Sequence, residues 1–263
     1  MAEPILSARH VTKSFDGGEA GRLVAIRDLS LDVAEGEFVC LLGASGCGKS
    51  TMLALFAGFL QPSAGQVMLR GAPITRIEPR CGMVFQSYAL FPWKTVRGNV
   101  EFGLKMQGIG RAPRRETAQR FIDLVKLTGF EERYPAELSG GMQQRVTLAR
   151  ILAADPEVLL MDEPFAALDA MTRQVMQAEL LRIHAASRKT TVFITHSIDE
   201  ALILADRIVV MSARPGRIRA VLANTLPTPR HVSVQLSPAY TALKAQVWQL
   251  VEAELLGHDP QGA

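Results

Sequence analysis

The sequence of 263 residues predicts an α/β fold with a mainly parallel sheet, and three patterns indicate it. The first is a set of short apolar runs typical of buried strands, at residues 38–42, 158–161, 191–194 and 208–211. The second is the helical spacing of the segments between these runs, an order that favours parallel strands joined by helices. The third is a glycine-rich turn directly after the first run.

The composition narrows the class of protein. With 48% hydrophobic and 21% charged residues the chain is an ordinary globular protein, which excludes disordered, collagen-like and coiled-coil structures. No apolar run approaches the roughly 20 residues that span a bilayer, and residues 1–10 do not resemble a signal peptide, so we expect a cytoplasmic protein. The net charge of +3 does not indicate nucleic-acid binding, and three cysteines predict free thiols.

Along the chain, the first third predicts strands, because Leu29, Leu31 and Val33 alternate with polar residues before the apolar run at 38–42. Residues from about 88 to 154 are mainly helical in spacing and predict a helical subdomain inserted in the α/β core. We expect one domain over residues 1–235, followed by a helical tail over 236–263. Six apolar residues of that tail fall on one helical face and predict a packed helix: Tyr240, Leu243, Val247, Leu250, Val251 and Leu255.

A phosphate-binding loop is predicted at residues 43–50, GASGCGKS, which fit G-x-x-x-x-G-K-[ST] between a buried strand and a helix. Glycines let backbone N–H groups turn inward around phosphate oxygens, and the following helix directs its positive end to the same place. Lys49 adds a charge for the phosphates, and the Ser50 hydroxyl can bind Mg²⁺. A dinucleotide loop is excluded, because Thr51 stands where its third glycine would be. The expected nucleotide-binding residues here are Gly43, Ala44, Ser45, Gly46, Cys47, Gly48, Lys49, Ser50 and Thr51.

Cys47 has two interpretations. It lies near Lys49 and a helix N-terminus, both of which favour a reactive thiolate that a maleimide could label. It could equally be a small residue that fills space in the loop.

Three further strand ends supply candidate catalytic groups. Asp162 and Glu163 end an apolar run, where Asp162 would hold Mg²⁺ and Glu163 would act as general base toward water. His196 follows the run 191–194 and could hydrogen-bond the γ-phosphate, although isolated histidines are usually structural. Gln86 follows the apolar residues 83–85, and is either a surface amide or a sensor of Mg²⁺ and water. The predicted catalytic set is Glu163, His196, Gln86 and Lys49, and the predicted Mg²⁺ set is Ser50, Gln86 and Asp162.

Residues 138–145, LSGGMQQR, resemble the signature segment of ATP-binding cassette (ABC) ATPases, and they lie between the phosphate loop and Asp162 in the usual order. The resemblance covers nearly the whole chain. It implies a P-loop NTPase core with an N-terminal antiparallel β portion and an inserted helical subdomain. It also implies a head-to-tail dimer with two ATP molecules between the subunits. Ser139, Gly140 and Gly141 would then contact the ATP of the opposite subunit.

Other positions match the same family. Phe15 corresponds to the aromatic residue that stacks on adenine, although tyrosine is commoner there. Gln86 and His196 match the glutamine and histidine loops, and Asp169 belongs to a D-loop, residues 167–169, that crosses the dimer interface. Ala166 stands where serine is frequent, which removes one possible hydrogen bond across that interface.

A narrower resemblance comes from three short segments. Met142 replaces the usual glutamine of the signature, and residues 90–93, LFPW, and 211–218, MSARPGRI, accompany it. Together they resemble importers of the nitrate, sulfonate and taurine group. Another compact importer ATPase, for a thiamine precursor or an amino acid, is the alternative, and a non-transport ABC ATPase is a further one. The chain ends too early for the regulatory β-domain of sugar and polyamine importers.

The resemblance implies an ATP hydrolase coupled to transport, with ATP and Mg²⁺ as its cofactors. Its expected partners are a second, identical ATPase subunit and a membrane permease that docks near Gln86–Trp93, a stretch unusually apolar for a loop. An extracytoplasmic solute-binding protein would act indirectly, and no nucleic acid is expected. The protein would then lie at the cytoplasmic face of the inner membrane as a peripheral subunit. The solute itself would be selected by the permease and binding protein.

Overall fold

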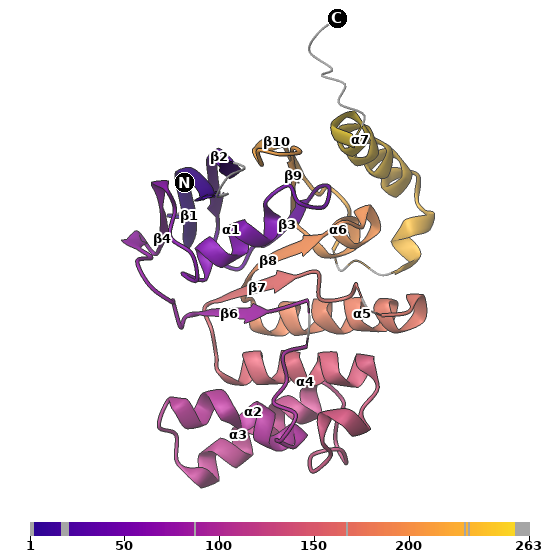
Figure 1. Cartoon of the computed structure of the whole chain (residues 1–263). Helices are drawn as coiled ribbons and strands as arrows, with labels where there is room; N and C mark the ends of the chain where they lie inside the picture. Colours follow the sequence, from indigo (N-terminus) through magenta and orange to yellow (C-terminus); the bar gives the residue numbers. More distant parts are fainter. Residues whose placement is uncertain are drawn as a thin grey trace, which may run out of the picture.

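The computed structural model describes residues 3–16, 21–86, 88–166, 168–228, 230 and 232–255, and it contains two sheets with helices around them (Figure 1). The N-terminal sheet is antiparallel in the strand order β2-β1-β4-β5. Its buried apolar residues share one hydrophobic cluster with those of the phosphate-loop helix α1. The strands are β1 (Leu6–Asp16), β2 (Arg22–Val33), β4 (Ala64–Leu69) and β5 (Ala72–Pro73).

The second sheet has the order β10-β9-β3-β8-β7-β6. Neighbouring strands from β9 to β6 are parallel, and β10 pairs with β9 in the antiparallel sense. The predicted mainly parallel sheet with an antiparallel N-terminal portion is therefore confirmed. Its strands are β3 (Phe38–Leu42), β6 (Cys81–Val84), β7 (Val158–Asp162), β8 (Thr190–Thr195), β9 (Arg207–Met211) and β10 (Ile218–Ala223).

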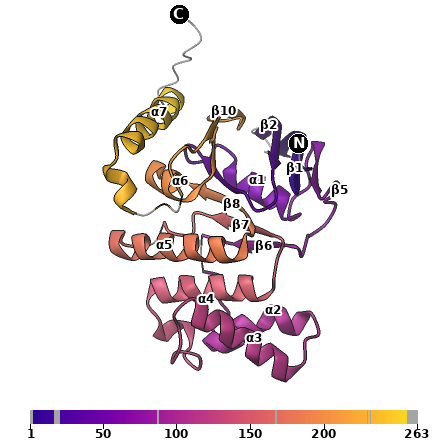
Figure 2. The ribbon, with the colours of Figure 1, turned by 180° about the vertical axis from the view of Figure 1, so that it is seen from behind.

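Strand β3 is buried on both faces, as its continuous apolar run predicts. Phe38, Cys40 and Leu42 point into one hydrophobic cluster, and Val39 and Leu41 into another. Helix α1 (Lys49–Phe56) covers the second cluster, whereas α5 (Ala170–Ser187) and α6 (Ile198–Leu204) cover the first. Figure 2 shows the same arrangement from behind.

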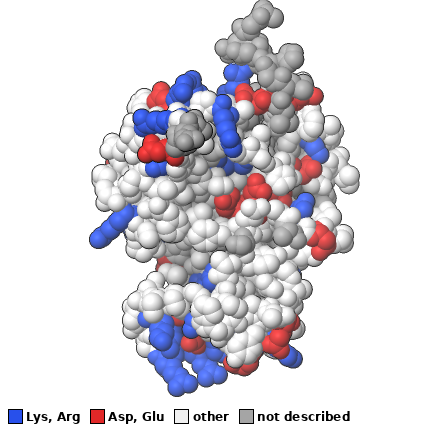
Figure 3. All heavy atoms as spheres, viewed as in Figure 1, with Lys and Arg blue, Asp and Glu red and all other residues white. Residues whose placement is uncertain are grey.

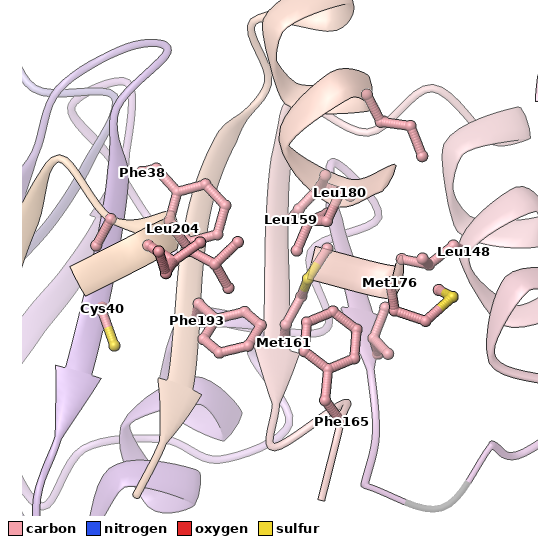
Figure 4. Packing of buried hydrophobic residues seen from close by; sticks show 14 of the residues in the cluster. Phe38, Cys40, Leu148, Leu159, Met161, Phe165, Met176, Leu180, Phe193 and Leu204 are labelled. Carbon is pink, nitrogen blue, oxygen red and sulfur yellow. The ribbon is translucent and has the colours of Figure 1, made fainter. Parts of the chain in front are cut away.

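Aromatic packing fixes the centre of the first cluster (Figure 4). The ring of Phe193 on β8 lies 5.9 Å from the ring of Phe38 and 5.6 Å from that of Phe165. Met161 of β7 and Met176 of α5 are also fully buried in this cluster. The loop that carries Phe165 is thus packed against two strands whose ends form the site described below.

The register of the parallel strands brings their following loops to one edge of the sheet. Leu42 pairs with Thr195, so the phosphate loop begins beside the loop that carries His196. Asp162 pairs with Ile194, so Glu163 follows at the same level. The carboxyl ends of β3, β7 and β8 therefore converge where ligands bind in open α/β sheets.

A helical layer lies below the sheet in Figures 1 and 2, between β6 and β7 in the chain. Its helices are α2 (Val96–Met106), α3 (Arg111–Leu124), the short η2 (Pro135–Glu137) and α4 (Gly140–Ala153). Thr95 caps α2 by accepting a hydrogen bond from the Gly98 amide at 3.2 Å. The domain limits 1–235 and 88–154 given above remain predictions.

The C-terminal part forms η3 (Val232–Leu236) and α7 (Pro238–Leu255). Tyr240, Leu243 and Val247 are buried in the same cluster as α6, as the expected packed helix requires. The side chain of Leu255 and residues 256–263 lie outside the described part of the chain. None of the described helices combines the length and apolar character needed to cross a membrane.

Candidate nucleotide-binding site

The phosphate loop turns sharply between β3 and α1, and its glycines make that turn possible. Gly46 and Gly48 have φ values of +76° and +98°, in the left-handed region that glycine adopts without strain. At Gly43 a Cβ atom would lie 2.9 Å from the carbonyl oxygen of Met211. The loop is therefore packed against the end of β9 as well as joined to β3.

Lys49 lies beneath this loop with only 5% of its surface exposed. Its Nζ donates hydrogen bonds to the carbonyl oxygens of Gly43 at 2.7 Å and Ala44 at 2.9 Å. Cys47 is 1% exposed, with its Sγ 3.7 Å from the same Nζ. The expectation of an accessible Cys47 thiol is therefore wrong, because the side chain fills space under the loop.

A cavity of about 370 Å³ opens beside the loop, which is large enough for a small-molecule ligand. It brings together nine of the predicted residues, which come from β1, the phosphate loop with α1, and the ends of β6 and β7. Three lining residues were not predicted as site residues: Leu23, Ala25 and Arg214. The predicted ones are Phe15, Ser45, Gly46, Gly48, Lys49, Ser50, Thr51, Gln86 and Glu163.

Ser50 and Asp162 form an oxygen pair at the edge of this cavity. The Ser50 hydroxyl donates to Asp162 Oδ1 at 3.1 Å, across 112 residues of sequence. Burial raises the pKa of the Asp162 carboxyl, the Ser50 hydrogen bond opposes that shift, and neighbouring Glu163 adds to it. A cation bound here would favour the ionised carboxylate.

Glu163 and His196 face each other at the ends of β7 and β8. Glu163 Oε2 lies 3.2 Å from His196 Nδ1, and the Glu163 amide donates to the Ile194 carbonyl oxygen at 3.1 Å. The φ of Glu163 is +44°, a left-handed conformation that is uncommon for a residue other than glycine. Such strain is frequent at functional sites, and here it accompanies a carboxylate directed at an imidazole.

Behind His196 lies a buried polar cluster that the sequence did not reveal. Glu200 accepts a hydrogen bond from the Thr195 hydroxyl at 2.5 Å, and its other oxygen lies 3.6 Å from Arg173 Nε. Thr195 Oγ1 in turn accepts from the Ser197 amide at 3.0 Å. The cluster ties β8, α5 and α6 together around the loop that carries His196. The feature of the sequence that could have indicated this cluster is a carboxylate in the first turn of a short apolar helix.

The signature residues are placed differently. Ser139 caps α4 and accepts from the Met142 amide at 3.4 Å, while Cβ atoms at Gly140 and Gly141 would meet Tyr88 and Thr172. Ser139, Gly140 and Gly141 are not among the described residues that line the cavity. The chain therefore does not bring its own signature segment to its phosphate loop.

Asp169 caps α5, where its Oδ1 accepts from the Thr172 amide at 3.0 Å. The Thr172 hydroxyl is the main cause that lowers the pKa of this carboxyl. Arg173 donates from Nη2 to the Leu168 carbonyl oxygen at 3.0 Å, which links this loop to the cluster around Glu200. Ala167, the first residue of the predicted D-loop, lies outside the described part of the chain.

One group of surface charges lies on the helical layer. Figure 3 shows Lys and Arg side chains gathered at the lower end of one face, where α2 and α3 lie in Figure 1. Arg114 there is engaged within the protein, by Glu101 at 3.1 Å and the Ile109 carbonyl oxygen at 3.0 Å. A hollow of about 1020 Å³ over α3 is lined by residues such as Arg97, Arg115 and Arg120, and includes no strand-end carboxylate.

Comparison with known proteins shows the family to which this chain belongs. Residues 26–166, more than half of the chain, match the family model described as ABC transporter. The nitrate import ATP-binding protein NrtD of a Synechocystis species is 49% identical over 80% of this chain and 79% of its own length. The taurine import ATP-binding protein TauB of Burkholderia pseudomallei is 53% identical over 76% of this chain and 77% of its own length.

The solved structures agree with the sequence relatives. A dimeric ATP-binding cassette, MJ0796, in a post-hydrolysis state bound to ADP and Pi, superposes with a TM-score of 0.74. It is 31% identical and covers 84% of this chain and all of its own. The chain thus belongs to the ABC transporter family, as an ATP-binding subunit whose ATP hydrolysis is coupled to transport.

Proposed function

We propose that this chain drives the import of a small anion, such as taurine, an aliphatic sulfonate or nitrate, through a separate permease. The observation that carries the proposal is its likeness to nitrate and taurine import proteins, at 49% and 53% identity over at least three quarters of the chain. The same proposal places the protein at the cytoplasmic face of the inner membrane as a peripheral subunit. A solute-binding protein outside that membrane would deliver the anion to the permease.

Within the nucleotide site we infer separate tasks for the strand-end residues. Phe15 offers an exposed ring at one end of the cavity for adenine, and the loop amides with Lys49 receive the phosphates. Glu163 accepts a proton from the attacking water as general base. His196, 3.2 Å from Glu163, orients that carboxylate and hydrogen-bonds the γ-phosphate. Gln86 lines the same cavity and responds to the γ-phosphate and metal.

The residues around Ser50 fit a magnesium ion. Ser50, Asp162 and Gln86 can each offer an oxygen ligand, which Mg²⁺ prefers, and Asp162 is a half-buried carboxylate whose ionised form a cation would stabilise. No cluster of three or more His, Cys, Asp or Glu side chains that could hold a metal occurs within the described ranges. The ion would thus be shared with nucleotide phosphates, and its chemistry is to neutralise phosphate charge.

The proposed active form is a head-to-tail dimer of identical chains. It is supported by the position of Ser139, Gly140 and Gly141 outside this chain's own cavity and by the dimeric state of the matched cassette structures. In such a dimer the start of α4 presents amide groups to the partner's γ-phosphate, because a helix N-terminus attracts anions. Asp169 would lie at the same interface. ATP would then stabilise the closed dimer, and hydrolysis would release it.

We further propose that a cytoplasmic helix of the permease docks near Gln86–Trp93. Trp93 is 71% exposed, and its ring lies 5.7 Å from that of Phe91. Helix α4 holds the loop, since Thr147 donates to the Tyr88 carbonyl oxygen at 3.0 Å and Arg150 to that of Ala89 at 2.8 Å. The docking loop is therefore tied both to Gln86 and to the helix that begins with the signature.

Substitution of Trp93 tests the docking surface. We expect Trp93→Ala to abolish co-purification with the permease and coupled uptake while the isolated chain still binds ATP. The matched control is Trp248→Ala, because Trp248 is also largely exposed, at 53%, but lies on α7. Intact permease binding and uptake in Trp93→Ala would show that the permease docks elsewhere.

The solute is tested by uptake in cells in which this chain is replaced by its Glu163→Gln form. Uptake of labelled taurine, an alkanesulfonate and nitrate is measured in parallel. Selective loss of one solute would identify the substrate and confirm its coupling to hydrolysis. Unchanged uptake of all three would contradict the anion assignment and direct attention to a thiamine precursor or an amino acid.

A further inference from the structure

The turn between β9 and β10, residues 212–217, rests on the phosphate loop. The Gly216 amide donates to the Ala25 carbonyl oxygen at 2.9 Å, and the Arg27 amide donates to that of Gly216 at 3.0 Å. A Cβ atom at Gly216 would lie 2.0 Å from the Cys47 carbonyl oxygen, so only glycine permits this approach. The turn is thus held between β2 and the loop by backbone contacts.

Arg214 extends from this turn into the wall of the nucleotide cavity. Its Nε donates to the Gly46 carbonyl oxygen at 3.0 Å, across 168 residues of sequence. A Cβ atom at Gly46 would lie 2.7 Å from one terminal nitrogen of Arg214, so the guanidinium lies directly against the loop. Of its five N–H donors, the structure assigns only Nε to an acceptor in the described ranges, and no carboxylate there pairs with it.

We propose that Arg214 binds the phosphate groups of the nucleotide held by the same chain, beside Lys49. This rests on the proposed nucleotide site. A guanidinium matches phosphate oxygens with two parallel N–H bonds, and it keeps its charge at any physiological pH. Its contact with Gly46 in the phosphate loop, rather than with Phe15, favours phosphate over adenine as the bound group.

Helix α7 holds the turn from the other side. Glu254 in its last turns accepts from the Ala213 amide at 3.1 Å, and its second oxygen lies 3.3 Å from Arg219 Nε. The helix is itself fixed to α6, because Asp199 accepts from Tyr240 Oη at 2.5 Å. Glu254 is therefore a positioning residue that acts on the nucleotide through the backbone beside Arg214.

ADP affinity is measured by calorimetry in the presence of Mg²⁺ for the native chain and for the variants Arg214→Gln and Arg217→Gln. Arg217 is the matched control, since it is an exposed arginine of the same turn that does not line the cavity. We expect Arg214→Gln to weaken ADP binding by about tenfold or more, the usual worth of a hydrogen bond to a charged group. Arg217→Gln should stay within about twofold, as surface substitutions do.

Salt separates a phosphate contact from a structural role of Arg214. If the guanidinium binds phosphate, the loss of ADP affinity in Arg214→Gln becomes smaller as the sodium chloride concentration rises. Dissolved ions screen the attraction between Arg214 and phosphate in the native chain, so there is less affinity to lose. A loss that is equal at low and high salt, or an unchanged ADP affinity, would overturn the proposal. Lys49→Ala tests the nucleotide site separately from the role of Arg214. If this variant also leaves ADP binding unchanged, the proposed nucleotide site itself is wrong.

Glu254→Ala tests the positioning role. We expect it to weaken ADP binding about two- to fivefold in the native chain and to have no further effect in Arg214→Gln, since coupled residues are not additive. An equal loss in both backgrounds would show that Glu254 acts independently of Arg214.

Discussion

The nucleotide cavity and the signature segment of this chain differ in how complete they are. The cavity gathers residues from β1, the phosphate loop and the ends of β6 and β7 into one hollow of about 370 Å³. The signature residues at the start of α4 are equally well formed, with Ser139 as a helix cap, but they are not among the described residues that line that cavity. We interpret the two regions as half-sites of the proposed dimer, the first of which the described residues assemble within one chain.

Different contacts hold the nucleotide cavity and the signature segment in place. Strand register and buried aromatic packing fix the cavity, so its geometry is set by the core of the chain. The signature is fixed by a helix cap on α4 and lies close to Tyr88 and to Thr172 of α5. A variant can therefore damage one half-site while it leaves the other intact.

The largest expected effect comes from the carboxylate at the strained end of β7. Glu163→Gln should lower the rate of ATP hydrolysis by about 10²- to 10⁴-fold, because the proposed general base is lost, while ATP affinity changes little. Phosphate release and equilibrium nucleotide binding measure the two quantities. Glu116→Gln on α3, an exposed glutamate outside the cavity, is the control. Rapid hydrolysis by Glu163→Gln would assign the base elsewhere.

A smaller effect is expected for the polar cluster behind His196. Glu200→Gln should reduce kcat about tenfold with little change in KM for ATP, since Glu200 supports the loop of His196 and does not itself line the nucleotide cavity. The pH profile of kcat should shift at the same time, because burial raises the pKa of Glu200 and Arg173 opposes that shift. A kcat and a pH profile that match those of the native enzyme would limit the cluster to a structural role.

The smallest effect concerns the stability of the nucleotide-free cavity. Burial raises the pKa of the Asp162 carboxyl above its ordinary value of 3.8. Protonation of Asp162 therefore stabilises the folded state, and this contribution is fully present below pH 3.8. This stability is lost as pH rises through the raised pKa. Asp162→Asn should therefore unfold at a slightly higher temperature than the native chain at pH 7, without nucleotide.

Two further measurements on Asp162→Asn test this prediction. The difference in Tm should shrink as the pH falls toward 3.8. Mg²⁺-dependent ATP binding should fall in the same variant, because a proposed metal ligand is removed. A Tm at pH 7 below that of the native chain would contradict the sign derived from burial.

Sequence reasoning predicted the cavity better than its surroundings. The order of apolar runs and motifs located Lys49, Ser50 and Glu163, because each follows a strand whose neighbours the α/β pattern already implies. Arg214 escaped prediction as a site residue, since its contact with Gly46 spans 168 residues and depends on how one turn packs. Glu200 escaped because a carboxylate at the start of a helix is usually an exposed capping group.

The proposed dimer requires that the signature of one chain act on the nucleotide of a second chain. Ser139→Asp tests it in the Glu163→Gln background, because aspartate can still cap α4 but repels a phosphate. Sedimentation with and without ATP gives the dimer fraction, and dilute binding experiments give the affinity of one chain. We expect Ser139→Asp to abolish the ATP-dependent dimer and to leave the single-chain affinity unchanged. A persistent dimer, or a weakened affinity in the monomer, would contradict it.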